Sequence, residues 1–184
     1  MLWKKELVVD PMLDNYRLLA RYNTWFNTRL VDACEGLDDA ARKAPRGAFF
    51  GSIHGTLNHI LWGDTMWLGR FAAQGEAFDA LPADLLALPA GARHETELHA
   101  DWVALRAHRA RLDAAIEAWL AALPADFPQR TMRYSNTKGV QREHPMWQAL
   151  THFFNHQTHH RGQVTTLLMQ AGVDVGVTDL IALV

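Results

Sequence analysis

The stretch HFFNHQTHHRGQV, residues 152–164, places four of the chain's ten histidines within nine positions. It lies in a segment whose apolar repeat predicts a helix over about 145–172, beginning at Pro145 and ending at Gly172. A helix turns by about 100° per residue, so residues four apart lie on nearly the same side. The apolar stripe of this helix therefore decides which of the four histidines face the core.

The apolar stripe comprises Leu150, Phe153, Val164, Leu167 and Ala171. These residues fall between about −20° and +80° of His160, so His160 lies inside the stripe. His156, at about −40°, lies on its edge one turn earlier. His159, at about −100°, and His152, at about −80°, lie outside the stripe and are expected to face solvent or a partner. The helix thus selects His156 and His160 as an inward-facing pair.

An inward-facing pair of histidines has two interpretations. Buried ring nitrogens need partners, and two adjacent imidazolium ions would repel each other, so a shared metal ion is one way to satisfy both rings. The other is a single core histidine bonded to a backbone carbonyl, with the remaining histidines on the surface. The periodicity of this helix leaves both open.

A third metal ligand would have to come from another helix. The candidates are His54 and His59 in GSIHGTLNHILWGD, which lie about 140° apart on a helix and cannot both face one ion. The helix around them is apolar nearly all round, and its main stripe points away from His59. A second face that carries Trp62, Gly63 and Met66 also looks buried, and Gly63 leaves space one turn after His59. Periodicity therefore permits His59 without selecting it.

The rest of the chain predicts an all-α four-helix bundle with one short β-hairpin. The expected helices cover about 11–35, 52–75, 94–122 and 145–172, with Ser52 as the N-cap of the second. Residues 76–93 are expected to be irregular with a short helical turn, and the turn 136–139 predicts the hairpin between the third and fourth helices. One domain over 1–184 is expected, and the long second connection means that the topology need not be up-down-up-down.

Composition excludes several classes of function. A net charge of −2 without a basic stripe argues against nucleic acid and anionic membrane surfaces as partners. No apolar run approaches the roughly 20 residues of a membrane span, and the first residues lack the pattern of a signal peptide, so a cytoplasmic protein is expected. Cys34 is the only cysteine, so no internal disulfide can form, and it is expected to be a small buried residue rather than a nucleophile.

Sequence motifs exclude further classes. HETELH, residues 94–99, fails as a zinc-protease motif because Leu98 occupies the second ligand position. The chain contains no Glu-x-x-His, which argues against a ferritin-like di-iron site. It also lacks a nucleotide-binding glycine motif and the serine-hydrolase motif.

Three stretches together resemble the DinB/YfiT family of bacterial four-helix-bundle proteins. They are YNTWFNTRL (22–30), FGSIHGTLNHILWGDTMWLGRF (50–71) and HFFNHQTHHRGQV (152–164), and the closing LLMQAGVDVGVTDLIAL (167–183) also fits. The resemblance implies one divalent metal ion, such as zinc, nickel or iron, held by His59, His156 and His160. It supplies His59 where the periodicity left the choice open.

The resemblance also implies a function. A metal-dependent transferase, thiol-dependent in some relatives, that acts on a small-molecule substrate with a low-molecular-weight thiol is expected, in a homodimeric protein. The alternatives are a metal-stabilised or stress-response bundle without turnover, and a metal-dependent hydrolase or isomerase. Three neutral imidazoles leave an ion open positions, as in catalytic rather than structural zinc sites. No general base is evident in the motifs.

Several polar and aromatic residues are weaker candidates around such a site. Asp64 could orient a ligand of the ion, or be solvated or part of a helix cap. Hydrogen-bond partners of the histidines could be Asn23, Asn155 and Gln163. Arg161 is expected to pair with a carboxylate or a dimer partner. The tryptophans that could wall a pocket are Trp25, Trp62 and Trp67.

Overall fold

The computed structural model describes residues 11–74 and 81–184. The helices are α1 (Pro11–Glu35), α2 (Asp39–Lys43), α3 (Ile53–Ala72), α4 (Trp102–Ala122) and α5 (Met146–Gln170), the strands are β1 (Thr131–Ser135) and β2 (Gln141–Pro145), and the 3-10 turns are η1 (Ala83–Leu85), η2 (Phe127–Gln129) and η3 (Leu180–Leu183). The all-α prediction with a late hairpin is confirmed, as is a helical turn within 76–93. The second helix ends at Ala72, before the end predicted near Gly75, and Gly75 itself lies outside the described residues.

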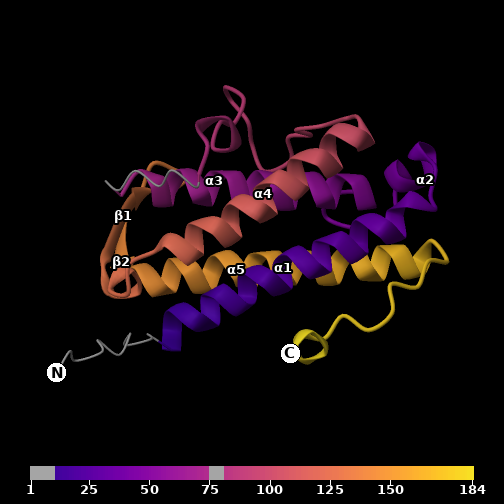
Figure 1. Cartoon of the computed structure of the whole chain (residues 1–184). Helices are drawn as coiled ribbons and strands as arrows, with labels where there is room; N and C mark the ends of the chain where they lie inside the picture. The colour runs from indigo at the N-terminus through magenta and orange to yellow at the C-terminus, as the bar shows by residue number, and fades with distance from the viewer. Residues whose placement is uncertain (1–10, 75–80) are drawn as a thin grey trace.

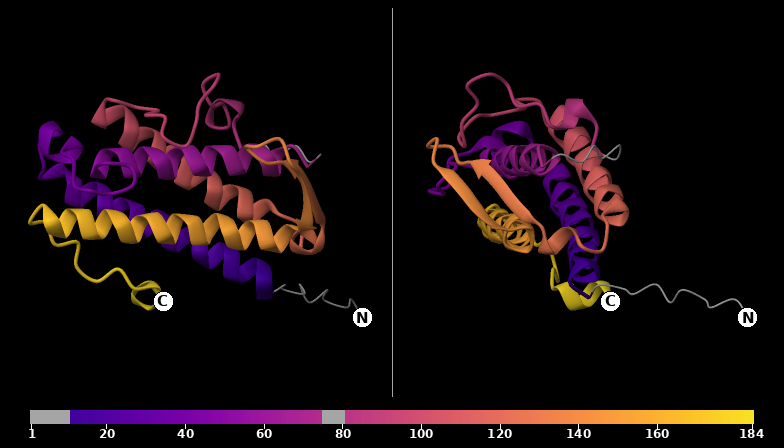
Figure 2. Two further views of the ribbon diagram at one scale, coloured as in Figure 1. Left: turned by 180° about the vertical axis from the view of Figure 1, so that it is seen from behind. Right: turned by 90° about the vertical axis from the view of Figure 1, so that its left-hand side faces the viewer.

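The four long helices lie side by side as a bundle (Figures 1 and 2). Helix α1 packs against both α4 and α5, and α3 packs against α5. Helices α1 and α5 run in one direction, and α3 and α4 run in the opposite one (Figure 1). The chain between α3 and α4 therefore returns to the end at which α3 began. As the long connection allowed, the bundle is not up-down-up-down.

The helix starts follow the capping residues. The Ser52 side chain accepts a hydrogen bond from the backbone N–H of Gly55 at 3.0 Å, which confirms it as the N-cap of α3. The predicted start of the third helix at 94 is wrong, because Asp101 caps α4 by accepting from Ala104 N–H at 2.8 Å. The short helix α2, capped by Asp38, was not predicted.

Residues 94–101 are not helical because side chains of α3 use their backbone groups. The carbonyl of His94 lies 2.9 Å from His59 Nδ1. The carbonyl of His99 lies 2.8 Å from His54 Nε2 and accepts from Asn58 Nδ2 at 3.1 Å. These contacts hold the segment against α3 and satisfy polar groups that a helix would have paired internally.

The β-hairpin covers one end of the bundle, where α4 ends and α5 begins (Figure 1). Strands β1 and β2 are antiparallel, with Thr131 opposite Pro145 and Ser135 opposite Gln141. In the turn, the carbonyl of Asn136 accepts from Gly139 N–H at 2.9 Å. Gly139 has φ +76°, a left-handed conformation that glycine adopts without strain. The hairpin predicted from residues 136–139 is confirmed.

A buried polar layer divides the core into two apolar clusters. The polar layer comprises Asn23, Asn27, Asp64, Arg109, Asp113, Gln157 and Arg161, each at most 4% exposed. Arg109 pairs with Asp64 Oδ2 at 2.5 Å and with Asp113 Oδ1 at 2.7 Å. Burial opposes the charge on Arg109, but the carboxylates of Asp113 and Asp64 together raise its pKa above the usual value. The layer thus joins all four long helices through buried charges and hydrogen bonds.

Three sequence expectations are corrected by the polar layer. Asp64 is 1% exposed and accepts from Gln157 Nε2 at 2.9 Å, so it is neither solvated nor part of a helix cap, nor does it contact the histidines. Arg161 donates to Asn23 Oδ1, and its guanidinium lies over two aromatic rings of α1 instead of against a carboxylate. Asn23 donates to Asp113 at 2.8 Å, so it partners this layer and none of the site histidines.

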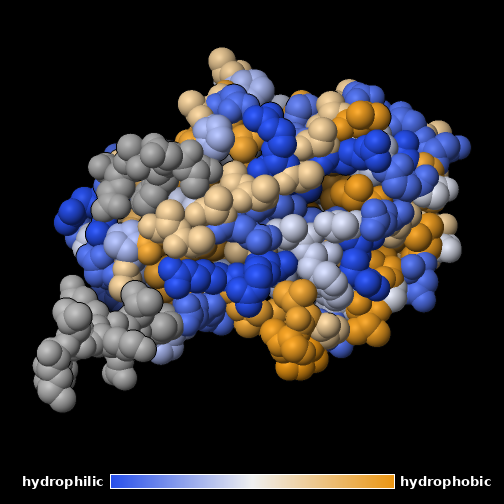
Figure 3. Space-filling view, viewed as in Figure 1, coloured by the Kyte–Doolittle hydropathy of each residue, from blue (hydrophilic) through white to orange (hydrophobic). Residues whose placement is uncertain are grey.

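Cys34 near the end of α1 is buried, whereas the C-terminal segment exposes apolar side chains. Cys34 is fully buried, and burial raises the pKa of its thiol to about 12, so the prediction of a small buried residue is confirmed. Exposed apolar side chains occur on the C-terminal segment, at Val177, Ile181 and Val184. Figure 3 shows an apolar patch at the lower edge of the molecule. Among the described residues, none of the helices is long and apolar enough to cross a membrane.

Candidate metal centre

Three histidines from two helices meet at one point. His59 lies on α3, and His156 and His160 lie one turn apart on α5. The Nε2 atom of His59 is 3.1 Å from Nε2 of His156 and 3.1 Å from Nε2 of His160. One ring nitrogen from each residue lies within 4.8 Å of the other two. The structure thus brings together the three predicted residues, across 97 and 101 positions of sequence.

The partners of the second ring nitrogens decide the tautomers. Nδ1 of His59 lies 2.9 Å from the carbonyl of His94, which can only accept, so Nδ1 carries the proton. Nδ1 of His160 lies 2.7 Å from Oε1 of Gln163 and is likewise the donor. In their neutral forms both rings therefore present a bare Nε2 lone pair to each other. The prediction of Gln163 as a hydrogen-bond partner of a site histidine is confirmed.

All three rings are neutral at neutral pH. Burial lowers the pKa of His59 to about 4, and the nearby histidines contribute. Burial and then the charges of His160 and His59 lower the pKa of His156 to about 3. Burial also lowers the pKa of His160. No second proton is therefore available on His59 or His160 to offset the repulsion of their facing lone pairs.

The donor set fits a divalent ion. Two imidazole nitrogens that bind one tetrahedral ion at about 2.0–2.1 Å lie about 3.3 Å apart, close to the spacing found here. Bare Nε2 atoms with Nδ1–H groups held by a carbonyl and an amide oxygen are the form in which histidine binds metal. An ion at this point would resolve the contact between facing lone pairs, so the residues present could hold one.

Aromatic rings and a glycine shape the surroundings of the histidines. The Phe50 ring stacks on His59 at 3.7 Å between centroids, and Trp62 stacks on the same imidazole at 5.9 Å. The His156 ring lies across Gly63, where an added Cβ would come within 2.6 Å of its Cε1 atom. The space that Gly63 leaves on α3 is thus filled by the His156 ring of the facing helix.

Replacing Gly63 by alanine is expected to weaken metal binding at least tenfold, because the new methyl group displaces the His156 ring from its place in the site. Helix propensity favours the change by about 1 kcal/mol, so α3 itself should not be weakened. Competition with a chromophoric chelator measures the affinity. Gly69→Ala is the matched control on α3, since its Cβ would meet only the Leu86 carbonyl at an ordinary 3.8 Å. Equal affinities of the two variants would contradict this role of Gly63.

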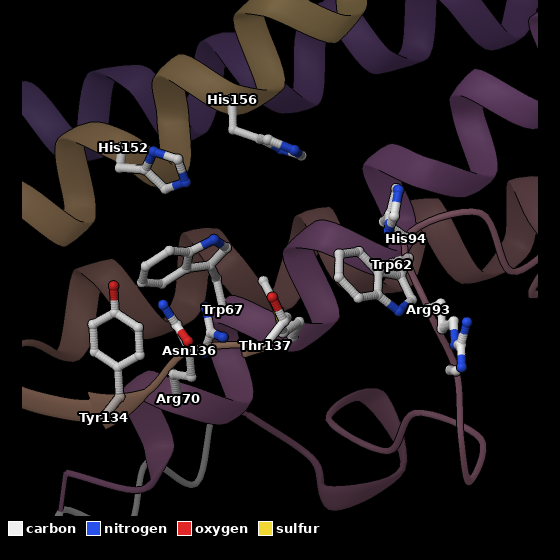
Figure 4. Close-up of a pocket in the computed structure, with 12 residues that line it drawn as sticks. Trp62, Trp67, Arg70, Arg93, His94, Tyr134, Asn136, Thr137, His152 and His156 are labelled. Atoms are coloured by element: carbon white, nitrogen blue, oxygen red, sulfur yellow. The ribbon is translucent and has the colours of Figure 1, made fainter. Parts of the chain in front are cut away.

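A cavity of about 800 Å³ opens beside His156, one of the three histidines (Figure 4). His156 and His152 line one side of it, and Trp62 and Trp67 line the facing side from α3. The expectation that these two tryptophans wall a pocket is confirmed, whereas Trp25 does not line this cavity. His152 is exposed, as its helical angle predicted, but it faces this cavity.

The other candidates do not belong to the three-histidine cluster. His54 bonds the His99 carbonyl and lies 3.0 Å from a Glu97 carboxylate oxygen, so it is held away from the three histidines. His159 is exposed, and its Nε2 contacts the Gln163 amide nitrogen at 3.3 Å. Asn155 is exposed on α5.

Sequence reasoning missed residues contributed by loops and by the far end of α3. Phe50 and the carbonyl of His94 come from segments without helical periodicity, so no pattern could place them. Arg70 also lines the cavity, and the spacing of residues along α3 could have indicated it. It lies four residues after Met66, so it continues the face of His59, Trp62 and Met66 by one more turn.

The second long helix supplies one histidine and the last long helix supplies two. The chain is therefore a helical bundle with a three-histidine site. The chain matches the sequence model described as the DinB family over residues 12–183, so it belongs to that family. Comparison with curated proteins found no match, and comparison with solved structures found none either.

Proposed function

We propose that this protein is a metal-dependent transferase that joins a low-molecular-weight thiol to an electrophilic small molecule, with His59, His156 and His160 as the metal ligands. The observation that carries the proposal is the meeting of three neutral imidazole nitrogens at the wall of a large cavity, where His156 belongs to both. Family membership supports it, because the resemblance to this family implies these three histidines as metal ligands.

A divalent ion bound by three neutral imidazoles keeps its double charge and open positions, so it would lower the pKa of a bound water or thiol. Zinc, nickel and iron all suit imidazole ligands. In the proposed reaction the thiol loses its proton to water or buffer, and its sulfur bonds to an electrophilic carbon as the leaving group departs with the bonding pair.

The protein's own residues would prepare the site for this chemistry. The His94 carbonyl and Gln163 hold two imidazoles in the tautomer that presents Nε2. Phe50 covers His59 and meets His160 edge to face, at 5.5 Å between centroids, which limits the access of water from that side. Trp62 and Trp67 offer apolar surface for the organic part of a substrate.

The test uses untagged protein loaded with zinc or with nickel. Cysteine and glutathione serve as thiols, and 1-chloro-2,4-dinitrobenzene serves as the electrophile, with thioether formation followed by absorbance. Turnover is expected to require the ion, to stop on chelation and to return when the ion is restored. Full turnover after chelation would contradict the mechanism.

The competing function is a metal-stabilised bundle without turnover. It shares the bound ion and predicts a large fall in melting temperature on chelation. It differs in predicting no thioether with any thiol and electrophile. Bound metal without turnover across such a panel would therefore favour this second function.

Membership in the DinB family also supports a homodimer and a cytoplasmic location as proposals. Sedimentation equilibrium of the untagged protein tests the first, with a mass near twice 20.8 kDa as the expected result. Cell fractionation tests the second.

A further inference from the structure

The cavity beside His156 carries positive charge. Two of the residues that line it are arginines, Arg70 from α3 and Arg93 from the segment before α4. None of the 12 lining residues drawn in Figure 4 is acidic. Cavities that bind charged ligands place such groups where they fix the orientation of the ligand. The charge of this wall therefore favours an anion.

Arg70 is held in place by aromatic rings. Its guanidinium lies 4.7 Å from the centroid of the Trp67 ring and 4.7 Å from that of Tyr134. A guanidinium that contacts rings through its faces keeps N–H groups at its edge for a planar acceptor. The contact to the Ser135 carbonyl is a long 3.5 Å. Within residues 11–74 and 81–184, no carboxylate forms an ion pair with Arg70.

Half-burial of Arg70 strengthens its attraction for an anion. Burial lowers the pKa of Arg70 from its usual value, but an arginine remains charged at neutral pH. A positive charge that has lost part of its water interacts more strongly with an anion than a fully solvated one does. Arg93, in contrast, is exposed and adds charge at the rim.

We propose that this cavity selects a small organic anion, with its carboxylate paired to Arg70 and its apolar part against Trp62 and Trp67. The opposite end of the ligand then lies at His156. This inference rests on the proposed function, because it assigns the substrate or the thiol of that reaction to the class of organic acids.

The separation of the two ends sets the size of the ligand. The His156 ring lies across Gly63, and Gly63 and Arg70 are seven residues apart on α3, which is about 10 Å along the helix axis. Side chains that reach toward each other shorten this span, so a ligand of the length of a dipeptide or tripeptide would join His156 and Arg70. The cavity of about 800 Å³ accommodates such a molecule and lies within the range of about 300–1,000 Å³ that is usual for ligand pockets.

The test compares 4-phenylbutyrate with its neutral amide, 4-phenylbutyramide. Binding to the purified protein is followed by calorimetry and by tryptophan fluorescence, since Trp62 and Trp67 line the cavity. The carboxylate is expected to bind about tenfold more tightly than the amide. Arg70→Gln is expected to remove this preference and leave the affinity for the amide unchanged. The amide thus reports whether the cavity of the variant is intact.

Two further arginine variants sharpen the test. Arg93→Gln, in an exposed segment, is expected to reduce the preference less than Arg70→Gln does. Arg21→Gln removes the same charge from an exposed position on α1, outside the cavity lining, and should keep the preference. Equal affinities of the two probes for the unaltered protein, or a preference that survives Arg70→Gln, would overturn the proposal.

Failure of this inference can be told from failure of the proposed function. His160→Ala removes a proposed metal ligand that does not line the cavity, so the preference for the carboxylate should persist in that variant. If the preference is lost in His160→Ala and kept in Arg70→Gln, the carboxylate binds the ion, and the role of Arg70 is refuted while the metal site stands.

Discussion

Untagged protein with His160 replaced by alanine is expected to be purified without its metal ion. Three protein ligands are proposed for the ion, and loss of any one should lower the affinity by more than the hundredfold that loss of a supporting hydrogen bond can cost. His156→Ala should behave in the same way. Elemental analysis of the purified proteins gives the stoichiometry, which should be near one ion per chain before substitution and near zero after it.

The control for the ligand variants lies on the same helix. His159→Ala removes an exposed imidazole next to His160 in sequence, and it should retain the ion. The melting temperatures of the ligand variants should equal that of the chelated protein, because an ion at about a hundred times its dissociation constant stabilises the fold by about 2.7 kcal/mol. Loss of metal in all three variants alike would contradict the assignment of ligands by helical angle.

Replacing Arg109 by methionine is expected to destabilise the protein by about 3–5 kcal/mol, because two buried carboxylates lose their common cation. Asp64 and Asp113 are 1% and 3% exposed, so little water reaches either carboxylate in the folded protein. Unfolding in guanidinium chloride, followed by circular dichroism, measures the difference. The loss should exceed that of any single surface ion pair.

Arg106→Met is the matched control on α4. Arg106 pairs with Glu35 at 2.7 Å, but both side chains are 44% exposed, so removal should cost at most about 1 kcal/mol. Similar losses in the two variants would contradict a special role of the polar layer.

Acid should reduce the effect of Arg109→Met. Burial raises the pKa of Asp64 and Asp113, whereas the charge of Arg109 lowers both, so the substitution is expected to raise the two pKa values further. Without the guanidinium, a folded-state pKa above the unfolded value means that the native state binds protons more tightly, so the variant gains stability as the pH falls toward the unfolded pKa of about 3.9. The difference from the unaltered protein should therefore be smaller at pH 4.5 than at pH 7.

Local sequence was sufficient to predict the hairpin and the helices that bury one continuous apolar stripe. In α5 the angle between residues predicted that His156 and His160 face inward, because a helix fixes angular position from spacing alone. The turn at Gly139 could be predicted because residues other than glycine rarely adopt a left-handed backbone conformation. The start of α4 could not be predicted from local sequence, because side chains of α3 bind the backbone of residues 94–101.

The polar layer shows a second limit of local patterns. Asp64 and Asp113 occur in helices at positions that a stripe assigns to the core, and only their common partner Arg109, on α4, explains how such charges are buried. Arg109 and Asp113 lie four residues apart on α4, so their pairing could be read from the spacing. The contact of Arg109 with Asp64 depends on the relative rotation and height of α3 and α4, which periodicity within one helix does not contain.

The amino-acid sequence by itself determined the four long helices, the hairpin and the inward direction of two histidines, because these depend on interactions between residues a few positions apart. Its resemblance to the DinB family supplied His59. Only the tertiary structure decided that the three Nε2 atoms meet, which ring nitrogens carry protons, and that Arg70 shares a cavity with His156. Those features depend on distances between helices, and packing of the whole bundle sets those distances.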